Sequence, residues 1–235
     1  MGSDQRIVEA ARISYKSPSK GPEQDKRLLE YLYKNKHTSP FEMCKITFNI
    51  KMPIFVMRQY VRHRMQNLNE VSARYTQLPN EFYIPKAWRP QDTKNKQGSI
   101  ATEDWNPALP DFNWDTGGKN ATEALESVCK HAYYTYEKLL EAGVAREMAR
   151  MSLPINVYTE VYVTWDLKNF LHFLGLRDDS HAQAEIVDYA RPMKQIGQIL
   201  FPWTFEAYEK YKFVVPKPTA TIPSYTVEPK SWKYV

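Results

Sequence analysis

Glycine is scarce in this chain. Its 235 residues include eight glycines, at positions 2, 21, 98, 117, 118, 143, 175 and 197. Their spacing allows neither a GxGxxG fingerprint nor a Walker-type phosphate loop. If the protein binds a nucleotide cofactor, it does not use the glycine-rich loop of the Rossmann fold. Arginine side chains and helix ends must then hold the phosphates.

Cysteine is scarcer still. Cys44 and Cys129 are the only two and form no CxxC pair. The sequence therefore supports neither a disulfide framework nor a zinc site, and we predict no metal site. Such cysteine usage is typical of a reducing compartment, so we expect a cytoplasmic protein.

Long apolar runs are also missing. No stretch reaches about 18 apolar residues, so we expect no membrane span. The first residues include Asp4, Gln5 and Arg6, and no apolar stretch of signal-peptide length follows, so we expect no signal peptide.

The composition is that of a globular protein with a mild basic excess. Hydrophobic residues make up 43% and charged residues 25%. Thirty-two Lys and Arg against 27 Asp and Glu give a net charge of +5. This balance suits anionic ligands, but it is too small to demand nucleic acid.

Periodicity predicts an α+β fold, an antiparallel sheet surrounded by helices in one domain. Cys44–Met52 alternates apolar and polar residues, as a half-exposed antiparallel strand does, and Ile155–Trp165 is rich in β-branched and aromatic residues. The clearest helix is Ala121–Glu141, which Gly143 ends. Asp166 can cap a helix that reaches about Leu176.

The remaining elements are weaker. We expect helices at about 4–15, 23–36, 144–151 and 202–211, a helix from 179 or 180 with a kink at Pro192, and a short strand at 81–85. The domain spans 1–211 with a long loop or insertion at 86–119, and 212–235 forms an arm rich in Lys and Pro.

The stretch Arg58–Tyr75, RQYVRHRMQNLNEVSARY, concentrates the chemistry of the chain. A helix from Pro53 to about Arg64 would place Gln59, Arg62 and His63 on one face, because residues three and four apart are neighbours there. A run of arginines on a helix can also be a solvated face.

Beyond this helix we predict a break and an extended segment. Asn67 and Asn69 are turn formers that would end the helix. An extended backbone would then point Glu70, Ser72 and Arg74 in the same direction. Together with the helix end, these side chains indicate a pocket for anions.

The same stretch resembles the signature of the flavin-dependent thymidylate synthases, RHRxxSxxxxSxR. Arg62-His63-Arg64 match its start, Asn67 stands where the first Ser usually lies, and Ser72 and Arg74 match its end. Five further blocks fall in the family's order and spacing, and a sixth match, ARISY, is weaker. The five are HTSPFE (37–42), PIFVMRQ (53–59), ARMSLPIN (149–156), LRDDSHAQAEI (176–186) and PWTFEAY (202–208).

The resemblance implies the family's fold and its reaction. That reaction is the reductive methylation of dUMP to dTMP, with 5,10-methylenetetrahydrofolate as carbon donor, FAD as hydride carrier and NADPH as reductant. It also implies a homotetramer with the sites at subunit contacts, and neither nucleic acid nor membrane as partner.

Matching positions imply the dUMP contacts and the catalytic residue. Arg177 is the catalytic candidate, because a fixed cation beside the uracil edge favours the deprotonated ring and so activates the carbon that accepts the methylene. An arginine that merely caps its helix end is the alternative. The implied dUMP set is Gln59, Arg62, Glu70, Val71, Ser72, Ala73, Arg74, Arg150 and Arg177.

Matching positions also imply the FAD contacts, with His37 near the flavin ring. The set is Ser39, Arg62, His63, Arg64, Asp166, Leu167, Lys168 and His172. Asp166 and Lys168 stand where the family commonly has Asn and Arg. A carboxylate at position 166 must face away from flavin phosphates, or the contact must use backbone atoms.

Both cysteines are expected in the core, Cys44 on the apolar face of a strand and Cys129 on a buried helix stripe. Neither has an activating neighbour in sequence, so we expect a mechanism without an enzyme thiolate. Two other functions stay open from the residues alone: a basic nucleic-acid-binding module, favoured by the positive charge and 16 tyrosines, and a different flavoenzyme on the same scaffold.

Overall fold

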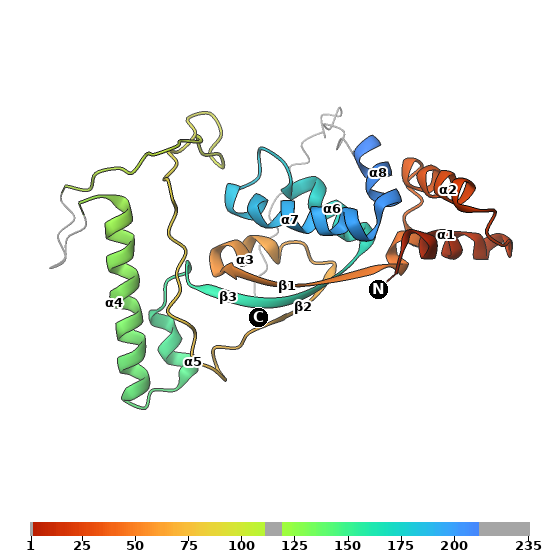
Figure 1. Cartoon of the computed structure of the whole chain (residues 1–235). Helices are drawn as coiled ribbons and strands as arrows, with labels where there is room; N and C mark the ends of the chain where they lie inside the picture. Colours follow the sequence, from red (N-terminus) through yellow and green to blue (C-terminus); the bar gives the residue numbers. More distant parts are fainter. Residues whose placement is uncertain (1, 111–118, 212–235) are drawn as a thin grey trace, which may run out of the picture.

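A three-stranded antiparallel sheet forms the centre of the protein (Figure 1). The computed structural model describes residues 2–110 and 119–211. The sheet order is β1 (Lys45–Pro53), β3 (Tyr158–Asp166) and β2 (Gln66–Glu70), so β3 pairs with both neighbours. Both predicted long strands are confirmed, although β3 begins three residues later than expected, after the turn that follows Pro154.

The strand β2 corrects one prediction. Asn67 and Asn69 do not form a turn, because they lie within β2 opposite Thr164 and Tyr162 of β3. The open edge of β3 needs hydrogen-bond partners, and pairing with it outweighs the low strand propensity of asparagine.

The two faces of the sheet differ in burial. Ile46, Phe48 and Ile50 of β1 point to the buried face, as do Val163 and Trp165 of β3. The opposite face is polar and carries cross-strand hydrogen bonds, such as the 2.8 Å contact between the hydroxyls of Thr47 and Thr164. The alternation read from the sequence is therefore confirmed.

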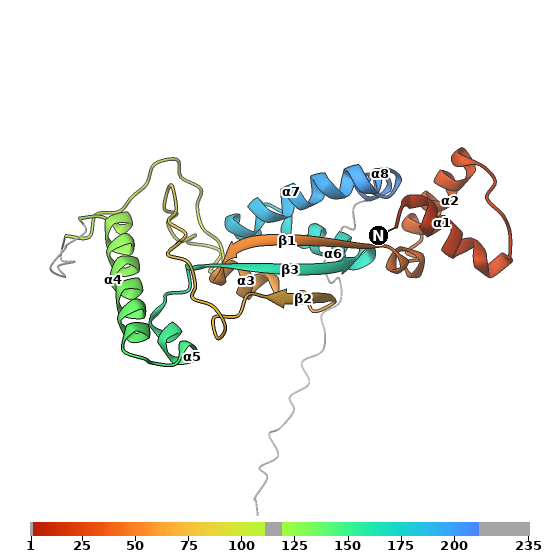
Figure 2. The ribbon, with the colours of Figure 1, turned by 60° about the horizontal axis from the view of Figure 1, so that its bottom comes forward.

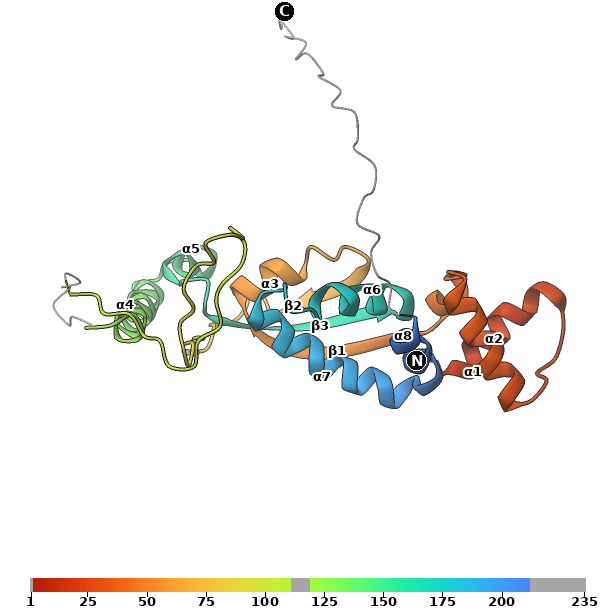
Figure 3. The ribbon, with the colours of Figure 1, turned by 90° about the horizontal axis from the view of Figure 1, so that it is seen from above.

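Helices cover the buried face and both ends of the sheet (Figures 1 and 2). Over the face lie α3 (Ile54–Tyr60), α6 (Leu167–Arg177), α7 (Ala184–Leu200) and α8 (Pro202–Lys210). Figure 3 shows the helices at the two ends of the elongated molecule. One end holds α1 (Asp4–Arg12) and α2 (Pro22–Lys34), with the short 3₁₀ helices η1 (Ile13–Tyr15) and η2 (Ser39–Met43), and the other holds α4 (Ala121–Glu141), α5 (Arg146–Ala149) and the 3₁₀ helix η3 (Arg150–Ser152). The predicted α+β class is confirmed.

Helix ends follow local capping. Helix α4 has the predicted bounds, with Asn120 accepting a hydrogen bond from the Glu123 backbone at 3.0 Å. Asp166 caps α6 as predicted. The predicted start of α7 at 179 or 180 is wrong, because the Asp179 carboxylate accepts two 2.8 Å hydrogen bonds from His181 and closes a separate turn.

The long loop is confirmed in its described part. Residues 86–110 contain no helix or strand, and residues 111–118 and the predicted arm 212–235 lie outside the described residues. Two contacts fix the loop to the helices. Trp88 donates a 3.0 Å hydrogen bond to Thr122, and Arg89 forms a 2.5 Å ion pair with the buried Glu185 of α7. The predicted strand at 81–85 is reduced to one bridge, Phe82 with Val157.

Candidate active site

The chain turns sharply after α3, at the RHR motif. The helix ends at Tyr60, so the prediction that it reaches Arg64 is wrong. Arg62 and His63 donate backbone hydrogen bonds three residues back, to Gln59 and Tyr60, which closes a tight last turn. The chain must then extend to begin β2 at Gln66. As a result the side chain of His63 turns inward, while Arg62 and Arg64 are exposed.

His63 meets Arg177 from the end of α6. Nε of Arg177 donates a 2.9 Å hydrogen bond to Nε2 of His63. The imidazole packs edge-on against Phe173, Trp165 and His172, with ring centroids 5.0, 6.2 and 6.5 Å away. Burial, together with the neighbouring Arg177 and His172, lowers the pKa of His63 to about 4. His63 is therefore neutral near pH 7. Burial also lowers the pKa of Arg177.

A second group of candidates follows β2. Backbone amides of Tyr75 and Thr76 donate to the carbonyl of Ser72 at 3.0 and 3.1 Å, so the segment is a turn. The prediction of an extended backbone that aligns Glu70, Ser72 and Arg74 is wrong. Arg74 instead reaches across to form a 3.0 Å ion pair with Glu147 of α5.

A pocket of about 180 Å³ lies beside this turn. Four of the predicted dUMP residues line it: Glu70, Val71, Ala73 and Arg150. The other lining residues come from α3, from the chain just after this turn, from the segment before β3 and from β3 itself: Ile54, Leu78, Leu153, Pro154, Ile155, Val157 and Thr159.

The sequence prediction missed two residues here, Thr159 and Glu147. The buried hydroxyl of Thr159 donates a 2.7 Å hydrogen bond to the Glu70 carboxylate. A hydroxyl on the buried, otherwise apolar face of β3 was the available signal for Thr159. Glu147 carried no comparable signal, because an acid on an exposed helix is ordinary.

The predicted FAD residues gather around the start of α6. The carboxylate of Asp166 accepts hydrogen bonds from the backbone and side chain of Asn169, at 2.9 and 2.7 Å. Leu167 is fully buried, and its backbone amide donates to the carbonyl of Cys44. Lys168 pairs with Glu42 of η2 at 2.7 Å. The carboxylate at position 166 is thus occupied by its own helix.

Three further members of this set are exposed. His172 lies one turn along α6 from Lys168, and Ser39 begins η2. His37 precedes η2 and packs edge-on against Tyr31, with ring centroids 5.9 Å apart. These side chains are accessible to a ligand that follows the surface between η2 and α6.

The predicted dUMP set falls into two groups in one chain. Gln59, Arg62 and Arg177 lie at the end of α3 and of α6, whereas the turn with Arg74 and the neighbouring Arg150 lie beyond the far end of β2. Within residues 2–110 and 119–211, no hydrogen bond or ion pair joins the two groups. The four steps from Gln66 to Glu70 alone span about 13 Å.

The first group contains polar atoms without partners. Oε1 of Gln59 is buried and accepts no hydrogen bond. In the described part of the chain, Arg62, Arg64 and Arg177 form no ion pair with a carboxylate. Buried polar atoms are rarely left unpaired, and clustered guanidinium groups bind phosphate and carboxylate. This region fits an anionic ligand with a planar polar edge.

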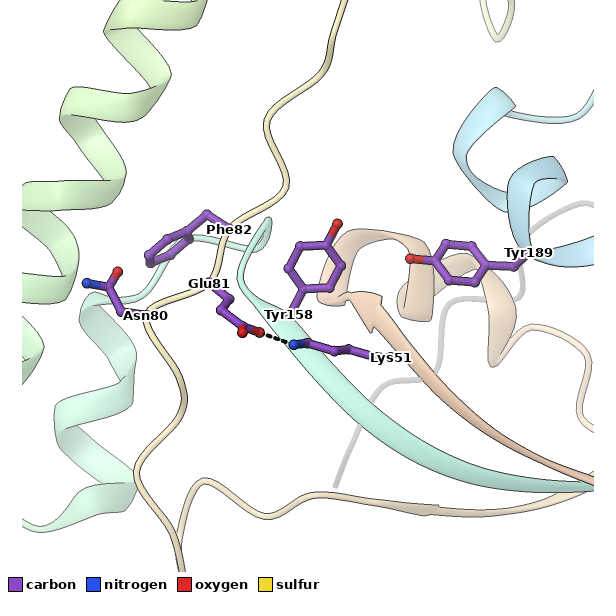
Figure 4. A pocket seen from close by; sticks show the side chains of 6 residues that line it. All are labelled: Lys51, Asn80, Glu81, Phe82, Tyr158 and Tyr189. Atoms are coloured by element: carbon purple, nitrogen blue, oxygen red, sulfur yellow. Dashed lines mark ion pairs between the residues drawn. The ribbon is translucent and has the colours of Figure 1, made fainter.

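A second, larger pocket of about 660 Å³ shares no lining residue with the smaller one (Figure 4). It is lined by Lys51, Asn80, Glu81, Phe82, Tyr158 and Tyr189. Lys51 and Glu81 in its lining form an ion pair with each other.

Other classes of site lack support in the described residues. Among 2–110 and 119–211, no group of three or more His, Cys, Asp or Glu could hold a metal ion, and no helix is long and apolar enough to cross a membrane. Cys44 and Cys129 are buried as predicted, and burial raises the pKa of both thiols.

Comparisons with known proteins identify the family of the chain. Residues 1–203 match the family described as thymidylate synthase complementing protein. The chain is 44% identical to the flavin-dependent thymidylate synthase of Thermosipho africanus over 213 residues, which cover 91% of this chain and 89% of that protein. It is 47% identical to the enzyme of the same name from Wolbachia pipientis, over 90% of this chain and 72% of that protein.

Solved structures show the same fold. The crystal structure of the UMP/dUMP methylase PolB from Streptomyces cacaoi, bound with 5-Br UMP, superposes with a TM-score of 0.72 at 29% identity and covers 89% of this chain and 90% of that one. The family match spans most of the chain, and several relatives exceed 40% identity. The chain therefore belongs to the flavin-dependent thymidylate synthase family of enzymes.

Proposed function

We propose that the protein methylates dUMP to dTMP with 5,10-methylenetetrahydrofolate as carbon donor, FAD as hydride carrier and NADPH as reductant. The observation that carries the proposal is the hydrogen bond between Arg177 and His63. The buried Oε1 of Gln59, at the end of α3, accepts no hydrogen bond and adds support. A half-buried guanidinium without a carboxylate partner in the described residues, held by a neutral histidine, suits the polar edge of a uracil ring.

Arg177 acts on the pyrimidine. Its terminal N–H groups bind N3 and the neighbouring carbonyl, and its fixed charge favours the deprotonated ring. Electron density at the ring carbon that accepts the methylene rises as a result. Gln59 and Arg62 contact the same nucleotide and fix its orientation.

The turn after β2 binds the phosphate end. A phosphate monoester carries a charge of about −1.5 to −2 near pH 7, and arginine forks match its geometry. Arg74 and Arg150 supply these forks, and Ser72 supplies a hydroxyl donor. Glu70, Val71 and Ala73 complete the wall of this subsite.

The start of α6 fits FAD. Lys168, Arg62 and Arg64 supply positive charge for its phosphates, and His37, Ser39 and His172 are exposed around them. Because Asp166 caps its own helix, its carboxylate does not oppose an anion there. His63 and the backbone of Leu167 complete the set. Bound FAD would supply redox chemistry, as the acceptor and donor of a hydride.

The mechanism needs no enzyme thiolate. Cys44 is fully buried, and its Sγ donates to the carbonyl of Ser3 at 3.5 Å. Cys129 lies 4% exposed against Asn156. Burial raises the pKa of both thiols, which disfavours the nucleophilic thiolate.

The complete site requires a second copy of the chain. Among the described residues, no hydrogen bond or ion pair joins the proposed uracil-binding residues around Arg177 to the proposed phosphate-binding residues around Arg74, although one nucleotide must touch both. We propose that a homotetramer brings the first group of one subunit to the second group of another, so that each site lies at a subunit contact.

Turnover by the purified protein tests this function. The preparation should show a flavin spectrum and form dTMP from dUMP only when methylenetetrahydrofolate and NADPH are both present. UMP is tested as an alternative substrate, because one similar protein of solved structure is a UMP/dUMP methylase. Growth of a thymidine-requiring bacterial strain is the matching test in the cytoplasm, where we place the enzyme. A flavin-free protein that binds single-stranded DNA would contradict the proposal.

A further inference from the structure

Arg177 is held through one edge of its guanidinium group. Its guanidinium makes one hydrogen bond in the described residues, from Nε to Nε2 of His63 at 2.9 Å. A guanidinium can present two different edges to a planar ligand: the side edge of Nε with one terminal nitrogen, or the end edge of both terminal nitrogens. The contact with His63 occupies the side edge.

We propose that His63 is a positioning residue for catalysis, which anchors Nε of Arg177 and leaves only the end edge for the pyrimidine. The proposal rests on the function proposed above and assigns to His63 a role towards Arg177, apart from any contact with the cofactor. The two terminal nitrogens then form a bidentate fork whose plane is fixed before the nucleotide arrives.

The surroundings of His63 support this role. Phe173 and Trp165 pack against the ring and restrict its orientation. A ring fixed by packing, on a rigid helix end and a sheet edge, holds its hydrogen-bond partner more tightly than a mobile surface residue can. Arg62 and Arg64 flank His63 in sequence and are exposed, so only the histidine is directed inward.

The protonation state of His63 is part of the geometry. An N–H of Arg177 points at Nε2, so Nε2 must carry a lone pair, and the neutral ring must have its proton on Nδ1. The charged or titratable groups that face the ring are Arg177 and His172, both on α6, and both oppose protonation of His63. Protonated His63 could not accept from Arg177 and would repel it.

A double-mutant cycle on dUMP affinity tests the proposal with the FAD-loaded enzyme. His63→Phe keeps an aromatic ring in its packing but removes the acceptor, and we expect dUMP binding to weaken about tenfold. His63→Gln restores an acceptor and should bind within about twofold of wild type. Arg177→Ala should weaken binding more, and adding His63→Phe to it should change nothing further, because His63 acts through Arg177.

Controls separate this role from others. His181→Phe, at a histidine whose side chain is 85% exposed and pairs with Asp179, should leave dUMP affinity unchanged. Flavin absorbance is measured for every variant. If the losses of dUMP affinity caused by His63→Phe and by Arg177→Ala multiply in the double variant, the proposal is overturned. The proposal is also overturned if His63→Gln binds dUMP as weakly as His63→Phe does, or if both variants lose FAD to the same extent. A wild-type protein that neither binds dUMP nor forms dTMP would instead overturn the proposed function.

Discussion

The hydroxyl of Thr159 on β3 donates a hydrogen bond to the carboxylate of Glu70 at the end of β2, over 2.7 Å. Thr159 is 4% exposed, whereas Glu70 is exposed at the mouth of the smaller pocket. The two residues lie 89 positions apart in sequence and meet because β2 pairs with β3. A buried donor thus fixes the orientation of a carboxylate that we propose as a dUMP contact.

Replacing Thr159 with Val should weaken dUMP binding. The substitution keeps the shape but removes the donor, and a hydrogen bond to a charged group contributes about 1.5–3 kcal/mol. We expect the KM for dUMP to rise about tenfold with little change in FAD content. Thr164→Val, which removes a hydroxyl from the opposite face of β3, is the matched control and should leave the KM unchanged. An equal effect of both changes would contradict a specific role for Thr159.

Replacing Arg177 with Ala should abolish turnover and retain the flavin. Loss of the fixed cation removes the stabilisation of the deprotonated uracil, for which we expect a fall in kcat of at least about 10³-fold. Arg177→Lys keeps a charge without the fork and should recover only part of the loss. Arg6→Ala, at an exposed position on α1, serves as the charge control. Unchanged dTMP formation by Arg177→Ala would remove this residue from the mechanism.

Two inactive variants should restore activity together. Arg74→Ala removes a proposed phosphate-binding residue, and Arg177→Ala removes the proposed uracil-binding residue. A homotetramer of either variant alone should therefore be inactive. When both chains are expressed in one cell, random assembly should return about a quarter of the sites to a fully wild-type composition. The rate of dTMP formation per site is the measurement. No recovery in mixed oligomers of confirmed composition would show that one chain supplies the whole site.

Removing both thiols should preserve the reaction. The double variant Cys44→Ala and Cys129→Ala should form dTMP at a rate within about threefold of wild type, because neither buried thiol touches the proposed site. The free energy of unfolding should instead fall by about 1–3 kcal/mol, because the double variant loses packing and the contact of Cys129 with Asn156. Complete loss of turnover in a folded double variant would indicate a thiol mechanism.

Acid stability should depend on Asp25. Burial raises the pKa of this carboxyl, but hydrogen bonds from Ser19, Arg12 and Gln5 outweigh it and lower the pKa to about 2. Since the folded pKa lies below the unfolded value of about 3.9, Asp25 contributes stability above pH 4 that is lost as the pH falls towards 2.

Asp25→Asn isolates this contribution. We expect the variant to lose about 1–3 kcal/mol at pH 7, because charge-assisted hydrogen bonds become neutral ones. The difference in melting temperature between wild type and variant should shrink between about pH 4 and pH 2. A constant difference across this range would show that Asp25 does not titrate as its contacts require.

Local rules were sufficient for much of the fold. The alternation in Cys44–Met52 became β1, the period of Ala121–Glu141 became α4 with those bounds, and Asp166 caps α6. Each depends on residues within a few positions of one another, which a sequence displays directly. The buried state of both cysteines followed from the same patterns.

Long-range pairing decided the parts that local rules predicted wrongly. Asn67 and Asn69 have the propensity of turn residues, but the open edge of β3 made them a strand. That strand forces α3 to end at Tyr60 and turns His63 inward to Arg177. The turn after β2, closed on the carbonyl of Ser72, follows for the same reason.

The sequence by itself determined the inventory of the site: guanidinium groups in place of a glycine-rich loop, and thiols in the core. Only the tertiary structure decided which of those groups meet: Thr159 holds Glu70, and Glu147 holds Arg74. It also left the residues around Arg177 and those around Arg74 without a mutual hydrogen bond or ion pair within residues 2–110 and 119–211. The reason is physical. Residue types are read directly from the sequence. Contacts between residues that are tens of positions apart depend on which strand edges pair and which helix faces pack together.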